Sequence, residues 1–150
     1  PAQSVENRKR LSQMGSDLGF AFNFSDDTRM QNTFAAHQLL TWAQAKGLQH
    51  PLKMALFDAH FTQGHNVNDP EVLADVAASV GLDRTEALEV LSSGSFAEQT
   101  REAQQFWTSR GISGVPSMIF EGKYLITGAQ GADNYAQILR KVLEERDAAA

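Results

Sequence analysis

The sequence contains no cysteine. These 150 residues can therefore form no disulfide, thiolate metal site or thiol nucleophile of their own. A long apolar run is also missing, since no stretch approaches the roughly 20 residues that span a bilayer, and we expect no membrane partner. Basic residues are the minority, with 13 Lys and Arg against 18 Asp and Glu and a formal net charge of −5. That balance argues against nucleic acid, whose binding needs a basic surface.

The remaining composition, with 42% hydrophobic residues in 150, is that of one soluble domain long enough to bury a core. The first residues, Pro1-Ala2-Gln3-Ser4, include no methionine and no signal-peptide pattern. We expect an internal piece of a longer protein, located in the cytoplasm.

Apolar spacing predicts helices over most of the chain up to Gly111. Asp69 before Pro70 is a helix-start signal, and Asp83-x-x-Glu86 and Ser95-x-x-Glu98 are both typical of capping boxes. Asp26-Asp27 predicts a polar turn rather than a catalytic carboxylate pair. The expected helices cover residues 4–18, 32–46, 51–62, 70–80, 83–93 and 95–110, with an extended segment at 20–24.

The last forty residues predict a β-hairpin and a final helix. Strands are expected at 117–120 and 124–127 around a turn at 121–123, followed by a loop at 128–131 and a helix that contains Tyr135 and Val142. A two-stranded hairpin is marginal in water, and one helix can cover only one of its faces. Its two edges would keep unpaired backbone groups, so another element should pair with it.

The most specific motif is Gly114-Val115-Pro116-Ser117-Met118-Ile119-Phe120. On base rates alone, Pro116 would be an ordinary trans proline at the start of an edge strand. With the following turn and Tyr124, the motif resembles the cis-proline loop and hairpin of the DsbA-like thioredoxin-fold proteins. Further motifs in the same order resemble their FrnE-like branch: Ser4-Val5-Glu6-Asn7-Arg8, Phe22-Asn23-Phe24, Asn32-Thr33-x3-His37-x-Leu39-Leu40, Leu52-Lys53-Met54-Ala55-Leu56-Phe57 and Ile126-Thr127-Gly128-Ala129-Gln130.

The resemblance implies an α+β, mostly helical fold. Residues 1–112 would form a helical insertion with a short extended segment near 20–24, and residues 113–147 the C-terminal ββα half of a thioredoxin-like domain, together one structural unit. The N-terminal βαβ part and its Cys-x-x-Cys motif would precede Pro1. Without them the chain should oligomerise, swap segments or pair with a separate N-terminal fragment.

The resemblance also suggests the site. A cis Val115–Pro116 bond, next to Gly114, would present the backbone of Val115 to a substrate, and Asn32 and His37 would lie near the active-site groove. A surface or core role for His37 is equally compatible with its position. The other histidines, His50, His60 and His65, are expected at the surface, and Trp42 and Trp107 in the core.

Three functions remain open. The chain is the cysteine-free part of a thiol-disulfide oxidoreductase that acts on a protein or small-molecule substrate, with no catalytic residue of its own, no metal and no cofactor. Alternatively, it belongs to a glutathione-dependent isomerase or transferase of the hydroxychromene-carboxylate isomerase or kappa glutathione transferase type. The third alternative is a non-catalytic peptide-binding or chaperone-like module.

Overall fold

The computed structural model describes residues 2–25, 28 and 30–148. The chain divides into two compact units, Pro1–Arg101 and Glu102–Ala150, and each is described by itself. The turn expected at Asp26-Asp27 lies outside the described residues. None of the described helices is both long and apolar enough to cross a membrane.

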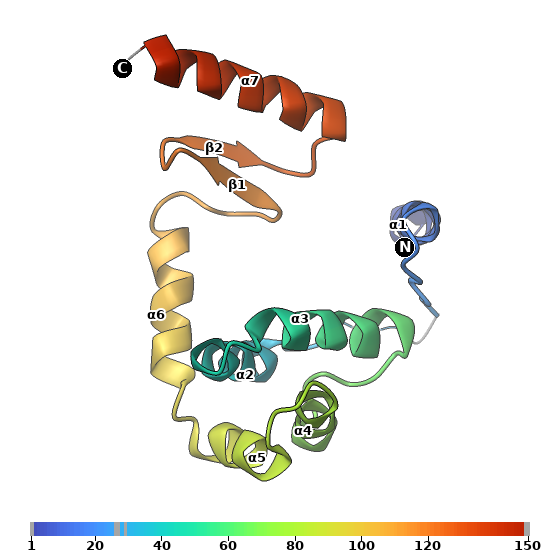
Figure 1. The fold of residues 1–150 in the computed structure, drawn as a ribbon. Coiled ribbons are helices and arrows are strands. Elements are labelled where there is room, and N and C mark those ends of the chain that lie inside the picture. The colour runs from blue at the N-terminus through green and yellow to red at the C-terminus, as the bar shows by residue number, and fades with distance from the viewer. Residues whose placement is uncertain (1, 26–27, 29, 149–150) are drawn as a thin grey trace. The chain divides into compact units, whose positions relative to one another are not determined.

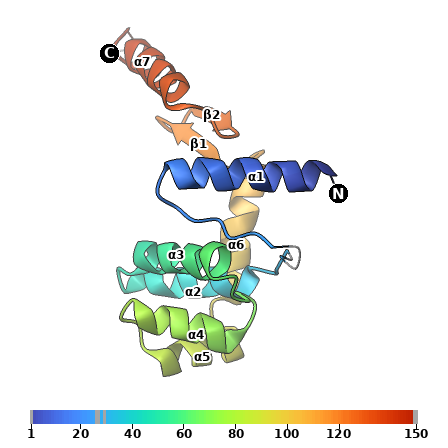
Figure 2. The ribbon, with the colours of Figure 1, turned by 90° about the vertical axis from the view of Figure 1, so that its right-hand side faces the viewer.

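The N-terminal unit is helical (Figure 1). The predicted helix at 51–62 is present in two parts, because its last turn widens into a π-helix. In both views α2 lies beside α3 and α4 lies beside α5 (Figure 2). The elements are α1 (Ala2–Asp17), α2 (Phe34–Ala45), α3 (Gln49–Phe57), the π-helix η1 (Asp58–Thr62), α4 (Pro70–Ser79), α5 (Arg84–Ser93) and the first part of α6 (Ala97–Thr108).

The segment expected to be extended at 20–24 forms no strand. It connects to η1 through the backbone N–H of Asn23, which donates to the Phe61 carbonyl at 2.8 Å, and through the Asn23 side chain, which donates to the Thr62 carbonyl at 2.7 Å. Phe22 packs edge-on against Phe61, with ring centroids 5.3 Å apart. The segment is therefore held by aromatic contacts and isolated hydrogen bonds instead of the regular backbone hydrogen bonds of a β-sheet.

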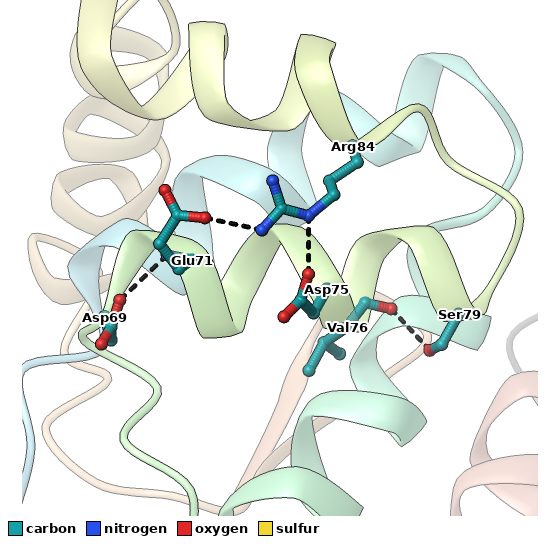
Figure 3. A network of polar contacts seen from close by, with 6 residues as sticks. All are labelled: Asp69, Glu71, Asp75, Val76, Ser79 and Arg84. Carbon is teal, nitrogen blue, oxygen red and sulfur yellow. Dashed lines mark hydrogen bonds and ion pairs between the residues drawn. The ribbon is translucent and has the colours of Figure 1, made fainter.

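The core of this unit lies where α2, α3, α4 and α5 meet. Leu39, Leu52 and Leu73 are its largest fully buried side chains, and Trp42 is buried as predicted, with 6% exposure. At the surface, Arg84 of α5 donates to Glu71 and Asp75 of α4, both at 2.6 Å (Figure 3). These ion pairs join neighbouring helices but add little stability, since they are exposed.

Two of the three predicted helix starts are capped by side chains. Asp69 accepts from the Glu71 N–H at 2.9 Å and Asp83 from the Glu86 N–H at 2.8 Å. The capping box at Ser95 is wrong: α6 begins at Ala97, and the Ser95 N–H instead donates to Ser93 Oγ at 3.4 Å. The left-handed Gly94 at the end of α5 (φ 64°) leads directly into this turn, so Ser95 lies within the link between two helices.

The C-terminal compact unit begins within α6, at Glu102. Thr100 is 3% exposed and shares a hydrogen bond of 3.1 Å with Thr41, and the Arg101 guanidinium lies over the Phe34 ring. All residues of α6 after Thr100 are exposed. Trp107, 45% exposed, is among them, so its predicted place in the core is wrong.

The C-terminal unit contains the hairpin and the final helix. Strands β1 (Ser117–Phe120) and β2 (Tyr124–Thr127) pair antiparallel, with Ser117 opposite Thr127 and Ile119 opposite Leu125. The intervening turn requires positive φ at Glu121 and at Gly122 (51° and 65°). Helix α7 (Ala132–Ala148) follows, as predicted.

Helix α7 covers one face of this hairpin (Figure 1). Tyr124 on that face hydrogen-bonds Glu145 of α7, and Phe120 and Ile126 beside it are half-buried. On the opposite face Ile119 and Leu125 stay 42% and 41% exposed. Among the described residues, the sheet has only these two strands, so each strand has one unpaired edge.

Candidate functional site

The loop that enters β1 is a tight, internally bonded turn. The Val115–Pro116 peptide bond is cis. Ser117 Oγ donates to the Gly114 carbonyl at 2.7 Å, and the Gly128 N–H donates to the Pro116 carbonyl at 2.8 Å. Gly114 faces Thr127, whose methyl group would stand 4.0 Å from a Cβ at that position. The hairpin therefore holds both ends of the loop.

Val115 projects from this loop into solvent, with 90% of its surface exposed. No other described residue hydrogen-bonds its N–H or C=O. Such a backbone donor and acceptor can pair with an extended chain as a strand edge does. What this loop offers chemically is therefore recognition, not proton transfer or nucleophilic attack.

The two other predicted site residues, Asn32 and His37, lie in the N-terminal unit at the start of α2. Asn32 Oδ1 accepts the Phe34 N–H at 2.9 Å, so this atom stabilises the first turn of α2, where Thr33 makes no side-chain cap. Its exposed position leaves the amide NH₂ available to solvent. The structure thus gives Asn32 a local structural role beside any binding role.

His37 lies one turn further along α2, at the rim of a pocket between α2 and the α3–η1 helix. His37 is exposed as a residue, but atoms packed around its imidazole desolvate the ring and lower its pKa, and the positive charge of Lys53 lowers it further. His37 is therefore neutral at pH 7. The pocket has a volume of about 190 Å³ and is lined by Thr33, Ala36, His37, Leu40, Lys53, Leu56, Phe57, His60, Phe61 and Val67.

The predicted surface position of His60 is wrong. It is half-buried in η1, and its Nδ1 is enclosed with no hydrogen-bond partner among the described residues. Its ring packs against Phe61 with centroids 4.6 Å apart. The spacing of Phe57, His60 and Phe61 at i, i+3 and i+4 could have placed these three rings on one helix face. His50 and His65 are exposed as predicted.

The described residues contain no cluster of three or more His, Cys, Asp or Glu side chains that could hold a metal ion. The pocket provides two imidazoles, one ammonium group and an apolar wall. This set can bind and orient a small molecule, whereas the loop at Val115 can bind a backbone.

The whole-chain comparison decides the family. Residues 1–140 match the DSBA-like thioredoxin domain. The chain belongs to this family. The DsbA-like chain is 30% identical to the thiol:disulfide interchange protein DsbA of Azotobacter vinelandii over 114 residues, and 27% identical to that of Pseudomonas aeruginosa over 115 residues. Each match covers 75% of this chain and about half of the relative, 53% and 54%.

Two further similarities cover almost the whole DsbA-like chain. The Bacillus subtilis protein YwbO is 24% identical over 140 residues, which is 93% of this chain and 70% of that protein. A crystal structure of a probable DsbA oxidoreductase from Streptomyces coelicolor matches with a TM-score of 0.85 at 27% identity, covering 96% of this chain and 62% of the other. The predicted fold, mostly helical with the hairpin and helix of a DsbA-like thioredoxin fold, is confirmed.

Proposed function

We propose that this chain is part of a thiol-disulfide oxidoreductase of the FrnE-like branch. It would supply the substrate-binding loop at Gly114, Val115 and Pro116 and a helical cap, while the redox dithiol would come from residues outside the chain. The observation that carries the proposal is the exposed, unpaired backbone of Val115 in a chain of the DsbA-like family. The FrnE-like assignment rests on the resemblance of the motifs from Ser4 to Gln130.

The substrate would be an extended segment of a thiol- or disulfide-containing polypeptide. Backbone pairing at Val115 would add the substrate as a short strand, a recognition mode that depends little on its side chains. Recognition through the backbone suits an enzyme that must accept many sequences around a cysteine. The thiolate that attacks would need a lowered pKa, which the chain as given cannot provide because it has no cysteine.

The rest of the thioredoxin-like domain would pair with the hairpin. Its uncovered face carries Ile119 and Leu125, and each strand has a free edge among the described residues. The N-terminal βαβ part of the fold supplies strands and an apolar surface of the required kind. In its absence, a second copy of the chain would have to cover the same surface.

The decisive experiment is to read the residues encoded before Pro1 and to assay the chain with and without them. We expect a β-strand followed by Cys-x-x-Cys, insulin reduction by the extended chain, and no turnover by the 150-residue chain. Ser-x-x-Ser in that place would favour the glutathione-dependent alternative, and neither motif would favour a non-catalytic binding module. Turnover by the cysteine-free chain would contradict the proposal outright.

A matched pair of variants in the active, extended chain tests the loop itself. Val115→Pro removes the exposed N–H, and we expect kcat/KM for a peptide substrate to fall about three- to tenfold, the worth of one hydrogen bond. Val115→Ala keeps the N–H and should leave kcat/KM within about twofold. Equal effects of the two substitutions would show that the valine side chain, not the backbone, contacts the substrate.

A further inference from the structure

The pocket between α2 and the α3–η1 helix has the composition of a small-molecule site. Most of its wall is apolar, with Leu40, Leu56, Phe57 and Phe61 supplying the larger side chains. A dry apolar cavity of about 150 Å³ accommodates a benzene ring. The volume here, about 190 Å³, therefore suits a compact apolar body of about seven or eight non-hydrogen atoms.

The polar groups of the pocket are few: the Thr33 hydroxyl, the imidazoles of His37 and His60, and the Lys53 ammonium. Lys53 carries the only formal charge among the lining residues, and no carboxylate contributes to the wall. Lys53 and His37 both line the pocket, and the positive charge of Lys53 acts on the imidazole by lowering its pKa. An uncompensated positive charge beside an apolar cavity favours an anionic ligand and disfavours a cationic one.

His60 provides the second, independent observation. Its enclosed Nδ1 lacks a partner among the described residues, although buried polar atoms are nearly always hydrogen-bonded. The residue lies in a π-helical turn, where the Gln63 N–H reaches back to the Asp58 carbonyl at 3.0 Å. Single π-turns within helices occur frequently at functional sites. Because this nitrogen is enclosed, a ligand would not contact it directly, and the His60 ring contributes to the pocket as part of its wall.

We propose that this pocket binds a small monocarboxylate with a compact apolar body, aromatic or branched aliphatic. The body contacts Phe57, Phe61 and Leu56, and the carboxylate lies on the side of Lys53. The imidazole of His37 offers a hydrogen bond to the polar end of the ligand, and the ring of His60 forms part of the wall. No covalent chemistry is involved.

The probe is 4-fluorophenylacetate, titrated into the 150-residue chain and followed by ¹⁹F NMR and by the histidine ring resonances. We expect saturable binding with Kd in the range of roughly 0.1 to 1 mM, reasonable for about eleven non-hydrogen atoms. The isosteric neutral amide, 4-fluorophenylacetamide, should bind about three- to tenfold more weakly. Shifts should appear at His37 and His60 and not at His50, which is exposed outside the pocket.

Two variants separate the apolar contribution from the charge. Phe57→Ala, at a side chain already 42% exposed, should weaken the acid and the amide equally, whereas Phe106→Ala in the other unit, 46% exposed, should weaken neither. Lys53→Gln should weaken only the acid and so remove its advantage over the amide. Lys141→Gln makes the same change in net charge on α7 and should alter nothing.

Three results would overturn the inference. One is binding that does not saturate below about 10 mM, and another is equal affinity for the acid and the amide. The third is an advantage of the acid that survives Lys53→Gln. Circular dichroism of each variant shows whether it is folded. We expect Lys53→Gln to remain folded, because Lys53 is exposed and forms no ion pair with a described carboxylate. None of these readouts depends on redox activity, so failure of the oxidoreductase proposal would leave them interpretable.

Discussion

Gly15 lies where α1 meets the segment that follows it. A Cβ added there would stand 2.5 Å from Phe22 Cδ2 and 2.6 Å from the Phe20 carbonyl oxygen, closer than atoms can approach. The Phe20 N–H also donates to the Gly15 carbonyl at 2.8 Å, so the segment folds back onto this helix position. Glycine is required here for close packing, not for an unusual backbone conformation.

We expect Gly15→Ala to destabilise the chain by a net of up to about 2 kcal/mol, because an overpacking cost of about 1–3 kcal/mol outweighs the roughly 1 kcal/mol by which alanine favours a helix. The measurement is the urea midpoint by circular dichroism, at an unchanged slope. Ser16→Ala, at the exposed neighbouring position, is the control and should stay within about 0.5 kcal/mol of the parent. A stabilised Gly15→Ala variant would mean that the segment does not dock on α1.

His37 gives the chain a stability that depends on pH. Its folded-state pKa lies below the ordinary 6.5, first because of burial and then because of Lys53. The unfolded chain therefore binds more protons in the window just below pH 6.5, and the free energy of unfolding rises with pH there. Stability contributed by neutral His37 is present above pH 6.5 and is lost as the pH falls through the folded-state pKa.

The test compares urea unfolding at pH 5.5 and pH 7.5. The parent should lose stability at the lower pH, and His37→Gln should lose measurably less. His50→Gln, which removes an exposed imidazole elsewhere on the chain, should lose as much as the parent. An identical pH dependence in His37→Gln would show that its imidazole is solvated in the folded state.

At the residue scale, the sequence alone could identify the loop at Val115 but not the pocket between α2 and the α3–η1 helix. Gly114, Val115 and Pro116 are adjacent in the chain, so a short motif contains all their information. The pocket joins His37 on α2 to His60 on η1, and only the packing of two helices determines that they share a wall. The π-turn at Asp58–Thr62 rotates the residues after it, which a regular helical spacing cannot anticipate.

At the scale of the elements, two helix starts with the same sequence pattern differ in whether a side chain caps the helix. Asp83-x-x-Glu86 and Ser95-x-x-Glu98 have the same pattern, yet only Asp83 bonds the backbone N–H three residues on. The backbone of Asp83 is itself extended, with φ −73° and ψ 124°, as an N-cap residue requires. Ser95 follows the left-handed Gly94, in a link of three residues between α5 and α6, where that geometry is not available.

This difference predicts unequal costs for the two alanine substitutions. Asp83→Ala should destabilise the chain by about 1 kcal/mol, and Asp83→Asn, which can still accept the bond, by only a few tenths. Ser95→Ala should be close to neutral, since its hydroxyl caps no helix. Urea unfolding of the three variants measures these costs. A cost for Ser95→Ala as large as that for Asp83→Ala would contradict the assignment of the α6 start.

For the molecule as a whole, the sequence predicts both strands of the hairpin and the helix that follows it, because turn residues and alternation are local signals. It could not predict that the C-terminal unit begins inside α6. That boundary depends on Thr100 bonding Thr41 across about sixty residues of chain, after which α6 makes no buried contact. Local periodicity continues through Arg101 and carries no sign of the change.

The exposed faces make the chain, in isolation, a candidate for self-association. Ile119 and Leu125 lie opposite each other on the uncovered face of the hairpin, beside two strand edges with no partner among the described residues. Exposed apolar strands with free edges pair with other strands. We therefore expect the 150-residue chain to sediment as a concentration-dependent oligomer.

Leu125→Lys should shift that equilibrium toward the monomer, because a charge on the uncovered face opposes edge-to-edge and face-to-face contact. Gln137→Lys on α7 adds the same charge at an exposed position that is polar in the parent and serves as the control. Sedimentation velocity from about 5 to 200 μM measures the effect. If the parent is monomeric throughout this range and unfolds cooperatively, its hairpin is stable without a further strand, and pairing with a missing segment is no longer required to explain the fold.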